Sequence, residues 1–300
     1  MTATSSQVWS LLSFLESPAN VLAALRQAGD YETHISEQGP DYPYFTMAKL
    51  ADRYSALGRS GAPSPLDLRD ATKLESASVS VSTYVRHARQ YFVGASEVDY
   101  TVRPTILYYG ALALGRAIAA ASTSEAPRRS HGLSMRTDDS VTVLANGEFA
   151  LLHDCLSTNF ELYAPDSPAG VDYPIDIVMS AIPYVREAMS QVGGADLPAL
   201  TKSAVDDRGD VSAITSGTNV TTSTHVLAVE HLALFVLSHW ARYRPIQWEQ
   251  KLRGEKEGWT YAYRTLMDLV GIDIPLLALN AITRENHRFG PYLGYRHYAP

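Results

Sequence analysis

The feature that most constrains this chain is a nearly uncharged helical pattern over residues 103–121. Its apolar residues recur at helix spacing and form one stripe: Leu107, Ala111, Leu114 and Ile118. Alanine and glycine keep the other faces small, so a second helix can approach closely. A second pattern, residues 224–243, is apolar nearly all round and predicts a central buried helix. The two patterns together indicate a mainly α protein built as a multi-helix bundle.

Weaker patterns predict the remaining helices. Apolar residues at helix spacing indicate helices near the N-terminus, over 18–27 and, in two pieces, over 66–95, where the Val/Ser alternation at 79–83 also fits a strand. Further helices are expected over 174–192, kinked at Pro183, and over 259–282, interrupted at Gly271. We divide the chain into an N-terminal helical segment, residues 1–65, and a helical domain, residues 66–300; one continuous domain is the alternative.

Two segments depart from the helical pattern. Residues 141–144 and 148–151 flank Asn146-Gly147, a strong hairpin signal, so one small β-hairpin is expected near residues 141–151. Residues 193–223 are rich in Gly, Ser, Thr and Asp and predict a long surface loop.

Composition excludes several classes of protein. The net charge of −7 disfavours a broad electrostatic grip on nucleic acid, although a local basic patch is compatible with it. The single cysteine, Cys155, fits a reducing cytoplasm, and we expect no secretory signal and no membrane span. The chain has no phosphate-binding P-loop, dinucleotide-binding glycine fingerprint, His-Glu-x-x-His or Gly-x-Ser-x-Gly motif.

Helical spacing places polar residues on shared faces of the two main helices. Tyr109 and Arg116 are seven positions apart, and His231 shares a face with Ser238 and Arg242. The histidines of the 224–243 helix are six and eight positions apart, whereas helical metal ligands usually lie three or four apart. No metal site and no cofactor are therefore expected.

Arginine and histidine residues near helix ends form the best candidate site. Guanidinium groups bind phosphate bidentately, and a histidine beside them can transfer protons near neutral pH. The candidate ligand-binding residues are Arg103, Tyr109, Arg129, Arg242 and Asn286, and the candidate catalytic residues are His131 and His287. The competing interpretation is structural: these groups cap helices and hydrogen-bond to loop carbonyls.

Several motifs together resemble the bacterial YaaC-like family over roughly residues 75–292. They are Arg103-Pro104-Thr105-Ile106-Leu107-Tyr108-Tyr109-Gly110, His131-Gly132-Leu133-Ser134, Asn146-Gly147-Glu148-Phe149, Arg242-Tyr243-Arg244-Pro245 with Trp248, and Asn286-His287-Arg288-Phe289-Gly290. The resemblance implies a soluble, mostly helical intracellular protein and supplies no catalytic residues. The Tyr-Tyr-Gly helix also resembles, distantly, the bundles of HEPN proteins, many of which are RNases or phage-defence components. Their signature, an arginine followed after four to six residues by a histidine, is absent here.

The main functional expectation is a cytoplasmic protein that binds a nucleotide or another small phosphate-bearing ligand, as a sensor or effector in nucleotide stress or phage defence. One alternative is a metal-independent phosphodiesterase or RNase that uses His131 or His287. Another is a non-catalytic scaffold with a protein partner, and a homo-oligomer is compatible with each. We expect no membrane partner, and nucleic acid is the disfavoured ligand.

Overall fold

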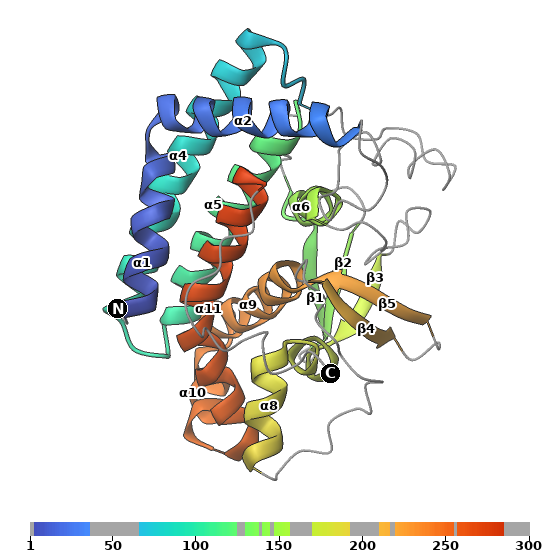
Figure 1. The fold of residues 1–300 in the computed structure, drawn as a ribbon. Coiled ribbons are helices and arrows are strands. Elements are labelled where there is room, and N and C mark those ends of the chain that lie inside the picture. Colours follow the sequence, from blue (N-terminus) through green and yellow to red (C-terminus); the bar gives the residue numbers. More distant parts are fainter. Residues whose placement is uncertain are drawn as a thin grey trace.

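The structure, a computed structural model, describes residues 3–36, 66–124, 130–137, 140–144, 147–156, 170–192, 210–216, 220–254 and 257–284. It confirms a mainly α fold with a small antiparallel sheet (Figure 1). The helices are α1 (Ala3–Leu12), the 3-10 helix η1 (Ser13–Glu16), α2 (Pro18–Ser36), α4 (Ala71–Ser96), α5 (Arg103–Ser122), α6 (Glu148–Leu156), α7 (Ile175–Ser180), α8 (Pro183–Val192), α9 (Val226–Tyr243), α10 (Pro245–Arg253) and α11 (Glu257–Thr283).

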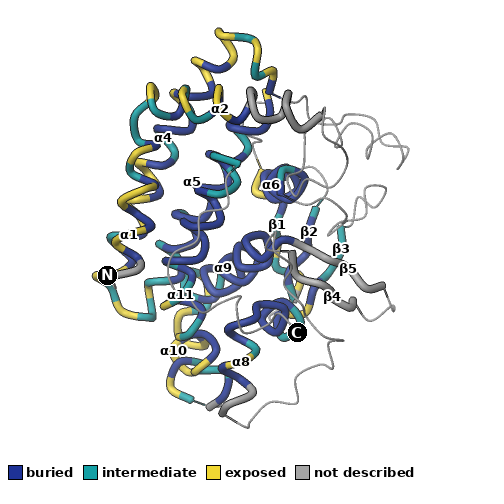
Figure 2. Tube along the Cα trace, viewed as in Figure 1, coloured by how far each residue is buried: buried dark blue, intermediate teal, exposed yellow. Residues whose placement is uncertain are grey.

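Helix α5 lies at the centre and packs against α4, α6, α9 and α11. Its neighbour α9 is buried along almost its whole length, as its apolar sequence predicted (Figure 2). Helix α4 begins at Asp70, whose carboxylate accepts hydrogen bonds from the backbone N–H groups of Thr72 and Lys73. It is one continuous helix, so the expected break and the strand alternative at 79–83 are wrong.

The antiparallel helices α4 and α5 approach each other closely at Gly110. A Cβ added there would lie 2.9 Å from two ring atoms of Phe92, which is buried. One residue before Phe92, the ring of Tyr91 stacks on that of Tyr109, with centroids 6.0 Å apart. Seven residues towards the other end of the pair, Tyr84 and Arg116 line the same cavity. Gly110 therefore determines how close the two helices lie and which of their side chains meet.

The predicted hairpin near residues 141–151 is half confirmed. Residues 140–143 form β2 (Ser140–Val143), which pairs antiparallel with β1 (Leu133–Thr137) and with β3 (Val171–Pro174). The expected second strand is wrong, because residues 148–156 form α6. The first N–H groups of this helix donate to the carbonyls of Ser130 and His131, long-range bonds that a local turn signal does not reveal.

The other breaks and loops differ in detail from the predictions. The expected break near Pro183 separates α7 from α8, whereas α11 continues through Gly271. Within the expected loop over 193–223, β4 (Asp210–Ser216) pairs antiparallel with β5 (Val220–His225). Valine, isoleucine and threonine favour strands, and here they outweigh the turn-forming residues. The predicted domain boundary falls at residue 65. Residues 37–65 lie outside the described residues, so the boundary stays a prediction.

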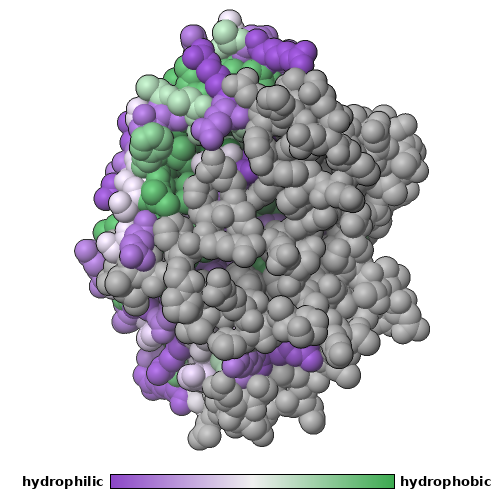
Figure 3. All heavy atoms as spheres, viewed as in Figure 1, coloured by the Kyte–Doolittle hydropathy of each residue, from purple (hydrophilic) through white to green (hydrophobic). Residues whose placement is uncertain are grey.

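Two of the described helices, α5 and residues 258–283 of α11, have the length and composition of a membrane span. In each, 67% of the most apolar window is buried inside the fold, as expected of helices in the core of a bundle. On the face shown in Figure 3, hydrophobic residues lie among hydrophilic ones over the N-terminal helices. The exposed side chains of Leu11 and Phe14 come from this end of the chain.

Two glycine substitutions test the close approach of α4 and α5. Gly110→Ala places a methyl group against the buried Phe92 ring and should lower the free energy of unfolding by about 1–2 kcal/mol. Gly271→Ala, within α11, meets no atom within 4 Å and should raise it by about 0.5–1 kcal/mol through helix propensity. Urea denaturation measures both. Equal effects of the two variants would contradict the tight contact.

Candidate functional site

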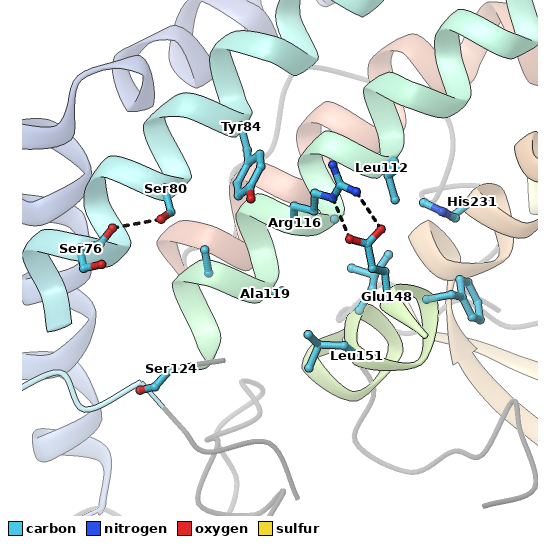
Figure 4. Close-up of a pocket in the computed structure, with 14 residues that line it drawn as sticks. Ser76, Ser80, Tyr84, Leu112, Arg116, Ala119, Ser124, Glu148, Leu151 and His231 are labelled. Carbon is cyan, nitrogen blue, oxygen red and sulfur yellow. Dashed lines mark hydrogen bonds and ion pairs between the residues drawn. The ribbon is translucent and has the colours of Figure 1, made fainter. Parts of the chain in front are cut away.

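The carboxylate of Glu148, in the first turn of α6, is the centre of the candidate site. It accepts two hydrogen bonds from Arg116 of α5: Nε to Oε1 at 2.9 Å and Nη2 to Oε2 at 3.1 Å (Figure 4). The Nδ1 atom of His131 lies 3.4 Å from Oε2. Glu148 is buried, Arg116 is partly exposed, and His131 has 45% of its side chain in solvent. One buried carboxylate therefore orients two groups that reach the surface.

A contact between two glycines brings His131 to Glu148. Gly132 has a φ of +72°, and a Cβ added to it would lie 2.5 Å from the Cα of Gly147. The adjoining backbone is fixed by hydrogen bonds from Glu148 N to Ser130 O and from Phe149 N to His131 O. Only glycine permits backbones this close, which explains the glycines in His131-Gly132 and Gly147-Glu148.

Arg116 stays charged in its partly buried position. Burial by itself lowers the pKa of its guanidinium, but the hydrogen bonds and negative charge of Glu148 outweigh burial, and the net pKa is raised. The Nη1 atom makes no hydrogen bond with any described residue. Its two N–H groups are therefore available to a ligand.

A cavity of about 360 Å³ lies beside this ion pair, between α4, α5 and α6. Ser76, Ser80 and Tyr84 of α4 supply hydroxyl groups, and Leu112, Leu151 and Leu152 supply apolar surface. Figure 4 shows Tyr84 and Arg116 on one side of the cavity and His231 of α9 on another. A mainly apolar cavity with a few polar groups is typical of small-molecule sites, whose volumes run from about 300 to 1,000 Å³.

The cavity wall contains a buried imidazole that lacks a hydrogen bond. His231 is 2% exposed, and its Nδ1 has no hydrogen-bond partner among the described residues. Burial and, to a smaller extent, the nearby His131 lower the pKa of His231 to about 3, so the ring is neutral. The ring of Tyr108 lies edge-on at 5.4 Å, and its hydroxyl, also buried, makes no hydrogen bond with a described residue.

The structure brings together three of the residues that the sequence predicted. Arg242 Nη1 donates to the Tyr109 hydroxyl at 3.2 Å, and the ring of the adjacent Tyr108 contacts that of His131, with centroids 6.0 Å apart. Tyr108 also contacts His231, so the shared face predicted for His231 and Arg242 is confirmed. Arg129, Asn286 and His287 lie outside the described residues.

Arg103 lies apart from this group. Its Nη1 donates to Asp268 of α11 at 2.9 Å, and its Nε and Nη2 donate to the carbonyl of Val98. Its guanidinium also lies 4.4 Å from the centroid of the Tyr100 ring. These contacts anchor the first turn of α5 to α11. They give Arg103 a structural role among the described residues, and the predicted ligand contact stays a prediction.

Three residues at the centre of the site were not among the predicted site residues. The seven-residue spacing of Tyr109 and Arg116 was the available signal for Arg116, and that shared face is consistent with the structure. Glu148 was obscured because its segment resembled a strand. His231 was interpreted as a core histidine, and its burial is correct. Among the described residues, no group of three histidine, cysteine or carboxylate side chains is placed to hold a metal ion.

The fold and this cavity define a mainly helical protein with a cluster of polar residues at the α5–α6 junction. Comparison with protein families finds the YaaC-like protein family over residues 48–208, more than half of the 300 residues. The chain belongs to the YaaC-like family. The matched range contains Tyr84, Arg116, His131 and Glu148 and ends before α9. No curated protein and no solved structure matches the chain.

The burial of neutral His231 predicts a pH-dependent stability. An unfolded histidine takes up a proton near pH 6.5, whereas folded His231 does so only near pH 3. As the pH falls through this window, the unfolded state alone gains the proton, and folding loses about 1.4 kcal/mol per pH unit from this residue. His231→Gln should flatten the dependence by that amount between pH 6 and pH 4, measured by urea denaturation. His87→Gln, on the exposed face of α4, is the control and should run parallel to the wild type; a His231→Gln curve that did the same would refute the assignment.

Proposed function

We propose that this protein binds a nucleotide-like ligand, with its planar ring in the α4–α5–α6 cavity and its phosphate against Arg116 and His131. The observation that carries the proposal is the polar cluster at the cavity: buried Glu148 holds the Arg116 guanidinium, whose Nη1 has two N–H groups with no partner among the described residues. A guanidinium fixed in this way is preorganised for an anion, since little freedom remains to be lost on binding.

The other residues at the cavity suit the two parts of a nucleotide, its base and its phosphate. Tyr84 and the leucines contribute the apolar and aromatic surface that a base requires. The Nδ1 atom of His231 has no hydrogen-bond partner among the described residues, and a polar ring atom of the ligand can supply one. Exposed His131 lies next to Glu148 and, when protonated, adds a second positive charge for the phosphate. A role in nucleotide stress or phage defence belongs to this proposal as its biological setting.

Titration calorimetry with the four ribonucleoside 5′-monophosphates tests the binding function. At least one should bind, and its parent nucleoside should bind about tenfold more weakly, since it lacks the charge-assisted hydrogen bonds to phosphate. His131→Gln should remove most of that difference without changing nucleoside affinity, and His87→Gln should leave both affinities unchanged. If none of the four ligands binds or raises the melting temperature at millimolar concentration, the proposal fails.

One observation favours a second function, metal-independent cleavage of a phosphodiester. The Nδ1 atom of His131 lies 3.4 Å from Oε2 of Glu148, so Nε2 is the ring nitrogen outside this contact and the one placed to accept a proton from a substrate. A 2′-hydroxyl that loses its proton to Nε2 can attack the adjacent phosphorus. The bond to the 5′-oxygen then breaks, the 5′-oxygen takes a proton from water and leaves as a hydroxyl, and a 2′,3′-cyclic phosphate remains. Arg116 lies where it can stabilise charge on the phosphate oxygens.

This second function predicts cleavage of the ribodinucleotide UpA in the presence of EDTA. His131→Gln should lower kcat by at least about a hundredfold, the usual contribution of a positioned general base. Chromatography of the products measures it, and the deoxy analogue should remain intact. Equal rates for the wild type and His131→Gln would refute His131 as the base, whereas nucleotide binding would stand.

A further inference from the structure

The guanidinium of Arg242, at the end of α9, has no carboxylate partner among the described residues. Its Nε donates to the Ser238 carbonyl and its Nη1 to the Tyr109 hydroxyl, each at 3.2 Å, and these are its hydrogen bonds in the described structure. Its Nη2 makes none. Arg103 and Arg116, in contrast, each form an ion pair with a carboxylate, that of Asp268 and that of Glu148. A partly buried cation bonded only to neutral oxygens keeps its attraction for an anion.

Aromatic rings surround this cation. The guanidinium carbon lies 5.8 Å from the Tyr109 ring centroid and 5.1 Å from that of Tyr243. Tyr91 stacks on Tyr109, and the side chains of Tyr91 and Tyr243 are 41% and 66% exposed. Exposed rings beside an arginine are the surface on which nucleic-acid bases stack, with no need for a particular base.

This surface continues the edge of the helix pair that carries the cavity. Tyr91 follows Tyr84 on α4 by seven residues, and Tyr109 precedes Arg116 on α5 by seven. Seven residues are about two turns, or roughly 10 Å, and they return to the same face of each helix. Because α4 and α5 are antiparallel, the two pairs lie in line along one edge. Between them, Tyr108 contacts both His131 and Arg242.

We propose that Tyr91, Tyr109, Arg242 and Tyr243 form a second subsite, which takes the second base of a dinucleotide. The linking phosphate is then the one that the proposed function places at Arg116 and His131, with the Arg242 guanidinium on the side of the second base. The proposal rests on the proposed function, because the first nucleotide occupies the α4–α5–α6 cavity. It names the ligand class more narrowly: two bases joined through phosphate, in place of a mononucleotide.

Titration calorimetry of the full chain with dAMP and the deoxydinucleotide dApdA tests the second subsite. Neither probe has a 2′-hydroxyl, so cleavage by His131 does not interfere. The wild type should bind dApdA about tenfold more tightly than dAMP, the gain expected from one stacked base. Tyr91→Ala should abolish that gain and leave dAMP affinity within about twofold, because Tyr91 does not line the cavity. Arg242→Gln should have the same selective effect.

Tyr261→Ala is the matched control, since Tyr261 is an exposed tyrosine of α11 outside this surface. It should leave both affinities unchanged. If dAMP binds and dApdA binds no more tightly, the second subsite is refuted while the proposed function stands. If neither probe binds, both proposals fail for adenine ligands. If dApdA alone binds and Tyr91→Ala removes it, the aromatic surface is supported and the cavity is not the nucleotide site.

Discussion

The close packing of α4 on α5 at Gly110 is the constraint on which the candidate site depends. Phe92 occupies the space that a side chain at this position would need, so the two helices meet with only one alignment of their faces. That alignment places Tyr84 near Arg116 and stacks Tyr91 on Tyr109. A slip of one residue along either helix would rotate its contacting side chains by about 100° and separate both pairs. The packing of the core therefore also determines how the side chains of these two pairs are arranged.

A pair of glycines, Gly132 and Gly147, allows the loop to approach α6 closely, as Gly110 allows α4 and α5 to approach each other. The contact of Gly132 with Gly147 holds the segment of His131 against the start of α6. The ion pair that forms there adds little net stability, because burying Glu148 costs solvation that Arg116 only offsets. Its value is in orientation, since both hydrogen bonds fix the plane of the guanidinium.

The sequence predicts the parts of this arrangement that depend on helix periodicity. The helices around 103–121 and 224–243, the burial of the second, and the shared face of His231 and Arg242 all follow from spacing within one element. The pairing of Arg116 and His131 with Glu148 does not, because these residues come from three separate segments. The wrong strand over 148–151 has the same origin: the carbonyls of Ser130 and His131, distant in sequence, complete the first turn of a helix there. Arg103 likewise fits an anion site by composition, and its partner Asp268 is 165 residues away.

The hydrogen bonding of the buried tyrosines supports a site at Tyr108. A core rich in tyrosine is stable only when most hydroxyl groups have partners, and Tyr184 donates to the buried carboxylate of Glu230 at 2.7 Å. Tyr109 accepts from Arg242, and Tyr100 donates to Asp268. The Tyr108 hydroxyl and His231 Nδ1 are exceptions among the described residues, and the two rings that carry them lie edge-on with centroids 5.4 Å apart. Leaving such groups unsatisfied costs about 1–3 kcal/mol each. The fold satisfies the neighbouring tyrosines and retains this cost at Tyr108 and His231, beside the cavity. Ligand recognition is a reason consistent with the N–H groups of Arg116 and Arg242 that have no partner among the described residues.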